Sequence, residues 1–513
     1  MKSIFLPRFQ DILFFSIFFA AIVLGPRMLN QDGDLPRHMA IGRYVLAGHL
    51  PPVHDIFSHT VPGASFAPHK WLSGVLFYLA YLIFAEKGMV ILSASALATT
   101  FTLIYAESVS RAGLRLPVFL LVIWGAAITS LHWIVRPHIF TMLLFAIWLI
   151  LTDRLAKGER VLIWYFPVLM LLWNNIHGEY ISGLLVTGAY LAGWIWDYLF
   201  NRDKAPAQTG KRLAAVAGLS LLVTLLNPIS LRAWGTVTDW MGNQYLMSHT
   251  DETIPPDFLQ SKFYILLAFL AFSLFLLAMK REKLSTGQSI ALAGFSALTL
   301  FSARNVHFYG VAAPFLLAPT LAGSLSVPVI KRYETFFSTT ESGSRGIFWA
   351  LGTVLVGIVL LAFTPLGFEQ RFSPAYFPVQ AVEWLKTHPQ QGEMFNPFDW
   401  GGYLSLKLPE KRVFIDSQGD VYGETFIRKY EQVITLQPSW QSILDEYSVR
   451  WALVPADWAL VRALSSDGWQ EVYRDGTAVV LTRSQLSAAN ACRPTLYALK
   501  PATTPHQSSW PEK

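Results

Sequence analysis

The sequence predicts a polytopic α-helical membrane protein that carries a small α/β domain near its C-terminal end. Charged residues make up only 14% of the 513 residues and hydrophobic residues make up 53%, whereas soluble proteins usually contain about 25% charged residues. The charges are also unevenly spread, because residues 1–364 hold 44 of them (12%) and residues 365–513 hold 30 (20%). This composition excludes a water-soluble enzyme and a disordered chain.

The apolar part contains twelve stretches that approach or reach the roughly 20 residues needed to cross a bilayer. They lie at 10–29, 70–86, 88–107, 115–133, 136–152, 161–176, 178–199, 212–227, 261–279, 286–303, 307–323 and 346–364. Five connectors between them hold fifteen Lys and Arg residues. The alternating connectors hold four, namely Lys87, Arg136, Arg232 and Arg304. The positive-inside rule therefore assigns the basic connectors to the cytoplasm.

The N-terminus, with Lys2 and Arg8, also has the charge of a cytoplasmic segment. Both assignments hold only if one of the twelve stretches fails to cross, and 70–86 is our choice for an interfacial or re-entrant helix. We therefore expect about eleven full spans, a cytoplasmic N-terminus and an extracytoplasmic C-terminal domain. The net charge of +6 and the pI near 9.2 then reflect basic cytoplasmic loops rather than a nucleic-acid partner.

This topology gives a transmembrane domain over 1–364 with two long outer loops, 30–69 and 228–260. Between Pro36 and Leu50 the apolar residues fall on one broad face, which predicts an interfacial amphipathic helix. The loop 228–260 contains several acidic residues and could cover a site.

The segment 365–483 changes to the short elements of a small α/β domain. Apolar runs at 412–415 and 451–455 indicate strands, and helices are expected at 378–388, 423–436 and 439–447. The runs 469–474 and 478–482 flank Asp475-Gly476, which predicts a hairpin. Residues 484–513 are polar and are expected to form a flexible tail.

Polar side chains of mixed type collect at the outward ends of the predicted helices, whereas the cytoplasmic ends carry mainly Lys and Arg. Such groups are costly at membrane depth unless they meet one another or line a wet cavity. We therefore expect one outer pocket, against the alternative of scattered structural polar groups. Its candidate residues are Asp32, Asp34, His38, His69, Lys70, Arg136, His138, Asn175, His177, Glu179, Arg304 and His307.

Asp32 and Asp34 directly follow the first span and form a D-x-D pair. Two such carboxylates could bind a divalent cation, Mg or Mn, or one could accept a proton from a hydroxyl group. The alternative is that Asp34 caps the following helix, since it precedes Pro36. Arg136 and Arg304 offer the forked donors that suit a phosphate, although contact with lipid headgroups is an alternative. The histidines lack the spacing of a zinc motif, and Cys492 is the only cysteine.

Several segments resemble a large bacterial group of integral membrane proteins related to the GT-C glycosyltransferases. They are D-G-D-L-P-R-H-M-A-I-G-R-Y-V-L-A-G-H-L-P-P-V-H-D-I-F-S (Asp32 to Ser58), H-K-W-L-S (His69 to Ser73), W-N-N-I-H-G (Trp173 to Gly178), F-N-P-F-D-W-G-G-Y-L and F-I-D-S-Q-G-D-V-Y. The resemblance covers most of the chain in layout and is sharpest in the first loop. It implies a fold of the GT-C type and an enzyme of the cytoplasmic (inner) membrane.

The resemblance also implies an activity, in which a sugar passes from a polyprenyl-phosphate carrier to an acceptor hydroxyl on a glycan, lipid or protein. Asp34 would activate the acceptor, and Asp32 would orient it or help to hold a cation. The same pocket would be lined by His38, His54, Asp55, His69 and Lys70. Arg136, Arg304 and His307 would offset the phosphate charge, while Asn175, His177 and Glu179 would bind hydroxyl groups.

Two other functions remain open from the sequence. A transporter would show internal repeats or broken helices near the midplane, and neither is convincing here. A scaffold for glycan or envelope assembly would use the outer domain to bind a partner, with Trp400, Asp416 and neighbouring residues as a recognition surface.

Overall fold

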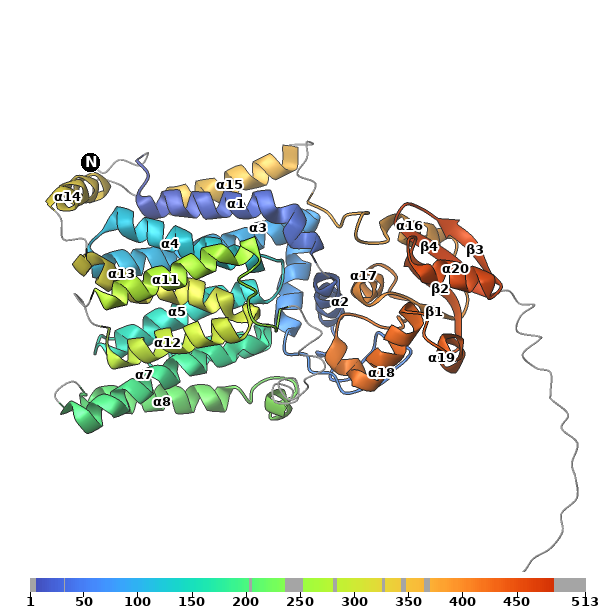
Figure 1. Cartoon of the computed structure of the whole chain (residues 1–513), viewed down its shortest axis with the longest axis horizontal. Coiled ribbons are helices and arrows are strands. Elements are labelled where there is room, and N and C mark those ends of the chain that lie inside the picture. Colours follow the sequence, from blue (N-terminus) through green and yellow to red (C-terminus); the bar gives the residue numbers. More distant parts are fainter. Residues whose placement is uncertain are drawn as a thin grey trace, which may run out of the picture.

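A bundle of long helices and a small α/β domain form the protein (Figure 1). The computed structural model describes residues 6–31, 33–202, 205–235, 252–279, 284–324, 328–342, 347–363 and 370–483. The bundle comprises α1 (Phe9–Asn30), α3 (Trp71–Ala112), α4 (Arg115–Thr129), α5 (His138–Ala156), α6 (Tyr165–Ile176), α7 (Ile181–Phe200), α8 (Ala207–Val223), α11 (Tyr264–Ala278), α12 (Thr286–Phe301), α13 (Val306–Ser324) and α15 (Ile347–Phe363). Helix α14 (Pro328–Ser342) connects the last two.

Five helical segments among the described residues are long and apolar enough to cross a membrane. They are Phe9–Asn30, Trp71–Ala112, Arg115–His132, His138–Ala156 and Ser261–Ala278, and shorter apolar helices occupy Thr286–Phe301 and Phe348–Phe363. A multi-pass helical membrane protein is thus confirmed in outline, whereas the count of eleven spans stays a prediction.

The two stretches 70–86 and 88–107 form one kinked helix, α3. At the kink, Phe84 (φ −147°) and Ala85 (φ 50°) leave the helical region. The part of α3 before the kink runs across the ends of the other helices instead of along them (Figure 1). The interfacial or re-entrant placement of 70–86 in the membrane stays a prediction.

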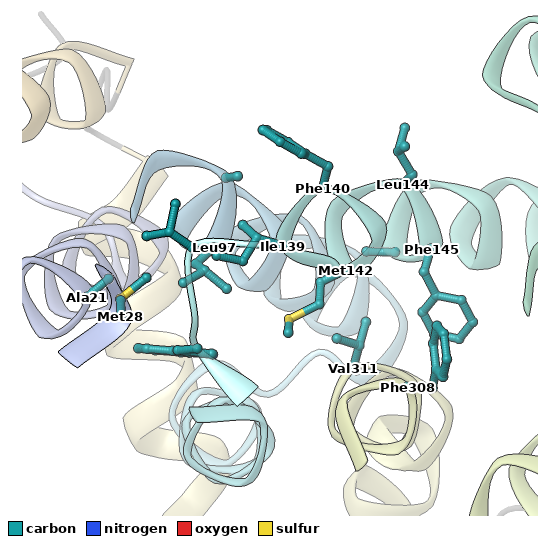
Figure 2. Packing of buried hydrophobic residues seen from close by; sticks show 14 of the residues in the cluster. Ala21, Met28, Leu97, Ile139, Phe140, Met142, Leu144, Phe145, Phe308 and Val311 are labelled. Atoms are coloured by element: carbon teal, nitrogen blue, oxygen red, sulfur yellow. The ribbon is translucent and has the colours of Figure 1, made fainter. Parts of the chain in front are cut away.

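The core of the bundle lies where α1, α3, α5 and α13 meet. Figure 2 shows side chains from these helices together, with Leu97 beside Ile139 and the ring of Phe145 against that of Phe308. The last two ring centroids are 4.9 Å apart. Most of these side chains are fully buried, so the bundle is packed internally and leaves apolar residues such as Leu274 and Phe301 exposed on its outside.

A network of ion pairs joins helices at the bundle end far from the α/β domain. Asp153, which is 1% exposed, pairs with Arg111 and Lys157, and Glu107 pairs with Arg111 and Arg154. Tyr190 and Gln288 also donate hydrogen bonds to Asp153. We call this group the distal network.

The α/β domain contains a four-stranded sheet of order β1-β2-β4-β3. Its strands are β1 (Glu393–Phe395), β2 (Val449–Pro455), β3 (Trp469–Arg474) and β4 (Ala478–Arg483), and only the β1–β2 pair is parallel. Its helices are α16 (Val379–Thr387), α17 (Phe398–Lys407), α18 (Gly419–Ile434), α19 (Trp440–Glu446) and α20 (Ala459–Ser466).

The expected hairpin is confirmed as β3 and β4, and 451–455 lies within β2. The strand expected at 412–415 is wrong, because Val413 in this segment forms an isolated bridge with Ser58, in the loop between α2 and α3, and does not pair with the sheet. It therefore joins the loop to the domain instead of joining the sheet.

Helix α2 (Asp34–Leu46) lies between the bundle and the α/β domain, next to α17 (Figure 1). It is the amphipathic helix expected after Pro36, and it packs on α3 and on α17. A methyl group on Gly42 would lie 2.1 Å from the carbonyl oxygen of Gly74 in α3. Glycine at both positions allows the two helix backbones to touch.

Candidate functional site

Charged and imidazole side chains from several helices meet at the end of the bundle that faces the α/β domain. We call this group the polar cluster. It contains Asp34, His38, His69, Lys70, His132, Arg136, His138, His177, Glu179, Glu252, Arg304 and His307. Its members lie at helix ends and in the adjoining loops, where the chain leaves the apolar layer.

Arg136 joins two carboxylates in one half of the cluster. Its Nη2 atom lies 2.8 Å from Oδ2 of Asp34, and its Nη1 atom lies 2.7 Å from Oε1 of Glu252. The backbone carbonyl of Glu252 accepts hydrogen bonds from the amide of Arg304 (2.7 Å) and the hydroxyl of Ser302 (3.1 Å). One guanidinium therefore bridges the first residue of α2 and the loop that precedes α11.

Glu179 is the centre of the other half. Its Oε1 atom lies 3.0 Å from Nε of Arg304, and its Oε2 atom lies 3.3 Å from Nδ1 of His177 and 3.3 Å from Nε2 of His307. The hydroxyl of Thr141 is 3.0 Å from Nδ1 of His177 and accepts a hydrogen bond from the indole of Trp173. These contacts fix the ring of His177 and hold the carboxylate beside three nitrogen-bearing side chains.

His38, His69 and Lys70 complete the cluster on the side of α2 and α3. The side chain of His38 is buried, and neither ring nitrogen has a hydrogen-bond partner among the residues described here. The ring of His69 lies against Gly178, whose added methyl group would be 3.2 Å from Cδ2. The charge of Lys70 acts on His38, on His69 and on Asp34.

The electrostatics of the cluster keep Asp34 charged and His38 neutral. Burial opposes ionisation of Asp34, but the charges of Arg136 and Lys70 outweigh it and hold the pKa of this carboxyl well below its usual range. Burial and the nearby charge of Lys70 hold the pKa of His38 well below its ordinary value. Burial likewise lowers the pKa of His69. At neutral pH the cluster thus offers a fixed carboxylate next to uncharged imidazoles.

His138, a member of the cluster, and Asn175, two residues before His177, both hydrogen-bond to other parts of the chain. The ring of His138 hydrogen-bonds to the carbonyl of His132. The amide of Asn175 accepts a hydrogen bond from Trp71 (2.9 Å) and donates to the carbonyls of Leu171 and Leu226. Asn175 therefore ties α6 to the start of α3 and to the segment after α8.

Three candidates are placed elsewhere or lie outside the description. Asp32 is outside the described residues. His54 is exposed, and its ring lies 3.2 Å from the carbonyl oxygen of Gly63. Asp55 is buried against Arg37, with 3.7 Å between Oδ1 and Nη2, and it accepts hydrogen bonds from Ser58. The structure therefore does not bring His54 and Asp55 into the polar cluster.

The structure adds residues that sequence reasoning did not select for the site. Glu252 comes from the loop 228–260, whose acidic residues were noted only as a cover. Ser417 and Asp399 come from the α/β domain, where the Ser417 side chain hydrogen-bonds to Asp34 and Asp399 lies within its electrostatic reach. Ser417 and Asp399 both lie in segments that were noted for the family resemblance, F-I-D-S-Q and F-N-P-F-D-W. Nothing in the sequence, however, indicated that these segments lie next to Asp34.

No group of three or more His, Cys, Asp or Glu side chains arranged to hold a metal ion occurs among the described residues. Asp34 is instead held by a guanidinium. The arrangement can bind an anion by exchanging carboxylate partners of Arg136 and Arg304 for ligand oxygens, and it places a carboxylate next to that anion.

Comparison with solved structures shows the fold. The oligosaccharyltransferase of Archaeoglobus fulgidus in the apo form aligns with a TM-score of 0.52 and 11% identity, over 86% of this chain and 69% of that one. ArnT from Cupriavidus metallidurans aligns bound to undecaprenyl phosphate (TM-score 0.50, 13% identity, 92% and 98% coverage) and in the apo state (0.52, 13%, 92% and 97%). No protein-family model and no curated protein sequence matches the chain. The chain thus has a GT-C-like fold, as its sequence predicted.

Proposed function

We propose that this GT-C-like protein is a membrane glycosyltransferase that moves a sugar from a polyprenyl-phosphate carrier to the hydroxyl of an extracytoplasmic glycan, lipid or protein. The observation that carries the proposal is the pairing of Asp34 with Arg136 inside a cluster that also contains Arg304 and Lys70. The structural neighbour ArnT, solved with undecaprenyl phosphate bound, supports a carrier of this class.

The binding step would be an exchange of ionic partners. Arg136 and Arg304 are neutralised by Glu252, Asp34 and Glu179 in this structure. A carrier phosphate would compete for these guanidinium groups, since Arg binds phosphate oxygens through the same forked donors. Loss of the Arg136 contact would raise the proton affinity of Asp34. Binding would in this way turn a paired carboxylate into a usable base.

In the chemical step the acceptor oxygen forms a bond to the anomeric carbon while the bond from that carbon to the phosphate oxygen breaks. The electron pair of the broken bond stays on the phosphate, whose charge Arg136, Arg304 and Lys70 would stabilise. The acceptor proton passes to Asp34. His177 and His307, held by Glu179, would orient hydroxyl groups of the sugar or acceptor.

A divalent cation between Asp32 and Asp34 stays a prediction, because Asp32 lies outside the described residues, among which no group of three or more His, Cys, Asp or Glu side chains could hold a metal ion. A Mg or Mn ion would offset phosphate charge if it bound there. The steps above use only groups of this chain.

Sidedness is a second part of the proposal. The polar cluster would face the extracytoplasmic side of the bacterial inner membrane, with eleven spans and a cytoplasmic N-terminus. Reporters fused after Lys87 and after Leu366 test it, and both should report the outside. A cytoplasmic signal from the second fusion would contradict the proposed topology.

Substitution of Asp34 by Asn tests the activity. The amide keeps the shape of the side chain but cannot take up the acceptor proton, so sugar transfer from a polyprenyl-phosphate donor should fall about 10²- to 10⁴-fold. Asp445→Asn is the matched control, because Asp445 also pairs with an arginine, Arg483, but lies on the surface of the α/β domain. Full transfer by the Asp34→Asn variant would remove Asp34 from the mechanism, and no transfer by the unsubstituted protein would favour a scaffold.

A further inference from the structure

The α/β domain contacts helix α2 at both of its ends. At its start, a methyl group on Gly33 would lie 2.1 Å from the carbonyl oxygen of Asp399, and one on Gly402 would lie 2.7 Å from that of Gly33. Near its end, Arg43 donates hydrogen bonds to the carbonyls of Leu406 (2.6 Å) and Ser405 (3.0 Å). Helix α17 therefore lies against α2 with backbone contact at the residue just before Asp34.

A buried charge cluster lies between these two contacts. Arg37 of α2 is 1% exposed, and its Nε atom is 2.5 Å from Oδ2 of Asp416 in the α/β domain. Its Nη2 atom lies 3.7 Å from Asp55 in the first outer loop. The rings of Phe57 and Phe66 lie 4.2 and 5.1 Å from its guanidinium carbon. Two carboxylates and two aromatic faces thus surround one cation, away from solvent.

The two carboxylates are fixed by their own neighbours. Asp55 accepts hydrogen bonds from the amide (2.9 Å) and the hydroxyl (2.7 Å) of Ser58. Asp416 accepts one from the amide of Gln418 (3.0 Å), and its own amide donates to the hydroxyl of Tyr422 (3.1 Å). Because a buried charge without its partner is strongly destabilising, the cluster favours a single docked arrangement of the domain on α2.

This arrangement bears directly on Asp34. Arg37 is one helical turn after Asp34 on α2, so fixing one residue fixes the other. Ser417, whose side chain hydrogen-bonds to Asp34, directly follows Asp416 in the chain. The same two segments therefore hold the structural pair and shape the surroundings of the proposed base.

We propose that Arg37 and Asp416 are positioning residues, through which the α/β domain sets the place of Asp34 relative to Arg136. The inference rests on the proposed function for its effect on transfer. It makes the α/β domain part of the catalytic arrangement, and it assigns Asp55 to this buried cluster instead of the substrate pocket.

The first test compares two arginines of α2 in the full-length protein. Arg37→Met should lower kcat for sugar transfer about 10- to 100-fold with little change in KM, because a displaced base slows the chemical step more than binding. Arg37→Lys should restore part of the rate. Arg43→Met, which removes the contacts with α17 at the far end of α2, is the matched control and should stay within about threefold.

A second pair of variants separates positioning from folding. Asp416→Asn removes the charge partner with little change in shape. The double variant Arg37→Met/Asp416→Leu removes both charges, and such replacements often preserve stability. It should resist unfolding better than Arg37→Met alone and still transfer slowly. A double variant with both stability and rate restored would overturn the proposal.

A chemical readout works without any transfer assay. In a Cys492→Ser background, the cysteine introduced by Asp34→Cys is treated with a polar maleimide. Its rate of modification should rise at least threefold when Arg37→Met is added and stay constant with Arg43→Met. Equal rates in all three proteins would overturn the positioning role. If the rate of modification rises but the protein without these substitutions transfers no sugar, positioning stands and the proposed glycosyl transfer fails.

Discussion

The bridge between Arg136 and Glu252 provides the sharpest test of the polar cluster. The two side chains are 20% and 28% exposed and their charged atoms are 2.7 Å apart. Hydrogen bonds between charged groups contribute about 1.5–3 kcal/mol when shielded, and exposed pairs contribute about 0.2–1 kcal/mol. For this intermediate exposure we expect a coupling energy of about 1–2 kcal/mol, which is close to a tenfold change in the unfolding equilibrium.

A double-mutant cycle measures this coupling. Arg136→Met, Glu252→Gln and the double variant are unfolded with SDS in mixed micelles, and tryptophan fluorescence follows the transition. The control cycle uses Arg428 and Glu424, an exposed pair on α18 with side chains 57% and 41% exposed, for which about 0.3–0.5 kcal/mol is expected. A coupling between Arg136 and Glu252 no larger than the control value would refute the pairing from which the proposed partner exchange starts.

Three further predictions follow from contacts near the site. The pKa of Glu252 is lowered from 4.5, because the charges of Arg136 and Arg304 outweigh the effect of burial. The ionised carboxylate should therefore stabilise the fold fully above about pH 4.5 and progressively less below it. Unfolding midpoints in SDS, compared between wild type and Glu252→Gln at pH 7 and pH 3.5, would show this loss. Gly42→Ala should lower the free energy of unfolding by at least about 2 kcal/mol, because its methyl group would meet the carbonyl oxygen of Gly74. Gly48→Ala is the control, because Gly48 has a φ of +95° but no neighbouring atom, so its substitution causes backbone strain without a steric clash. Thr141→Val should cost about 1 kcal/mol and remove one of the two contacts that hold Nδ1 of His177, so KM should rise while the fold persists; an unchanged KM would contradict the orienting role.

The membrane part of the fold follows closely from the sequence because long apolar runs leave a chain few alternatives in a bilayer. The kink in α3 was not predicted; the loop charges indicated only that 70–86 and 88–107 do not both cross the membrane, which stays a prediction. The helix α17 was not anticipated, because Gly401 and Gly402 lower its helix propensity. The reason for glycine at these two positions is close packing, because Gly402 lies against α2 and Gly401 lies against Ile415 and Asp416.

The site was predictable as a gathering of polar groups but not as a set of pairs. Sidedness alone placed Asp34, Arg136, Glu179 and Arg304 at one face, where the structure brings them together. The partner Glu252 could not be selected because its loop has no periodic pattern. Asp55 was assigned to the pocket from the family resemblance of the first loop, whereas its neighbour in space is Arg37. The spacing of residues along the sequence does not reveal which distant segments are in contact.

The distal network separates two processes that the same basic residues serve at different times. Arg111, Arg154 and Lys157 are among the fifteen cations that indicated a cytoplasmic side, yet in the folded protein each is paired with Glu107 or Asp153. Insertion responds to cations on the emerging chain and hardly to acids, before these partners have met. Replacing Glu107 should therefore lower the stability of the folded bundle without reversing the orientation of the chain in the membrane. Stability and orientation would thus respond to different mutations in the same network.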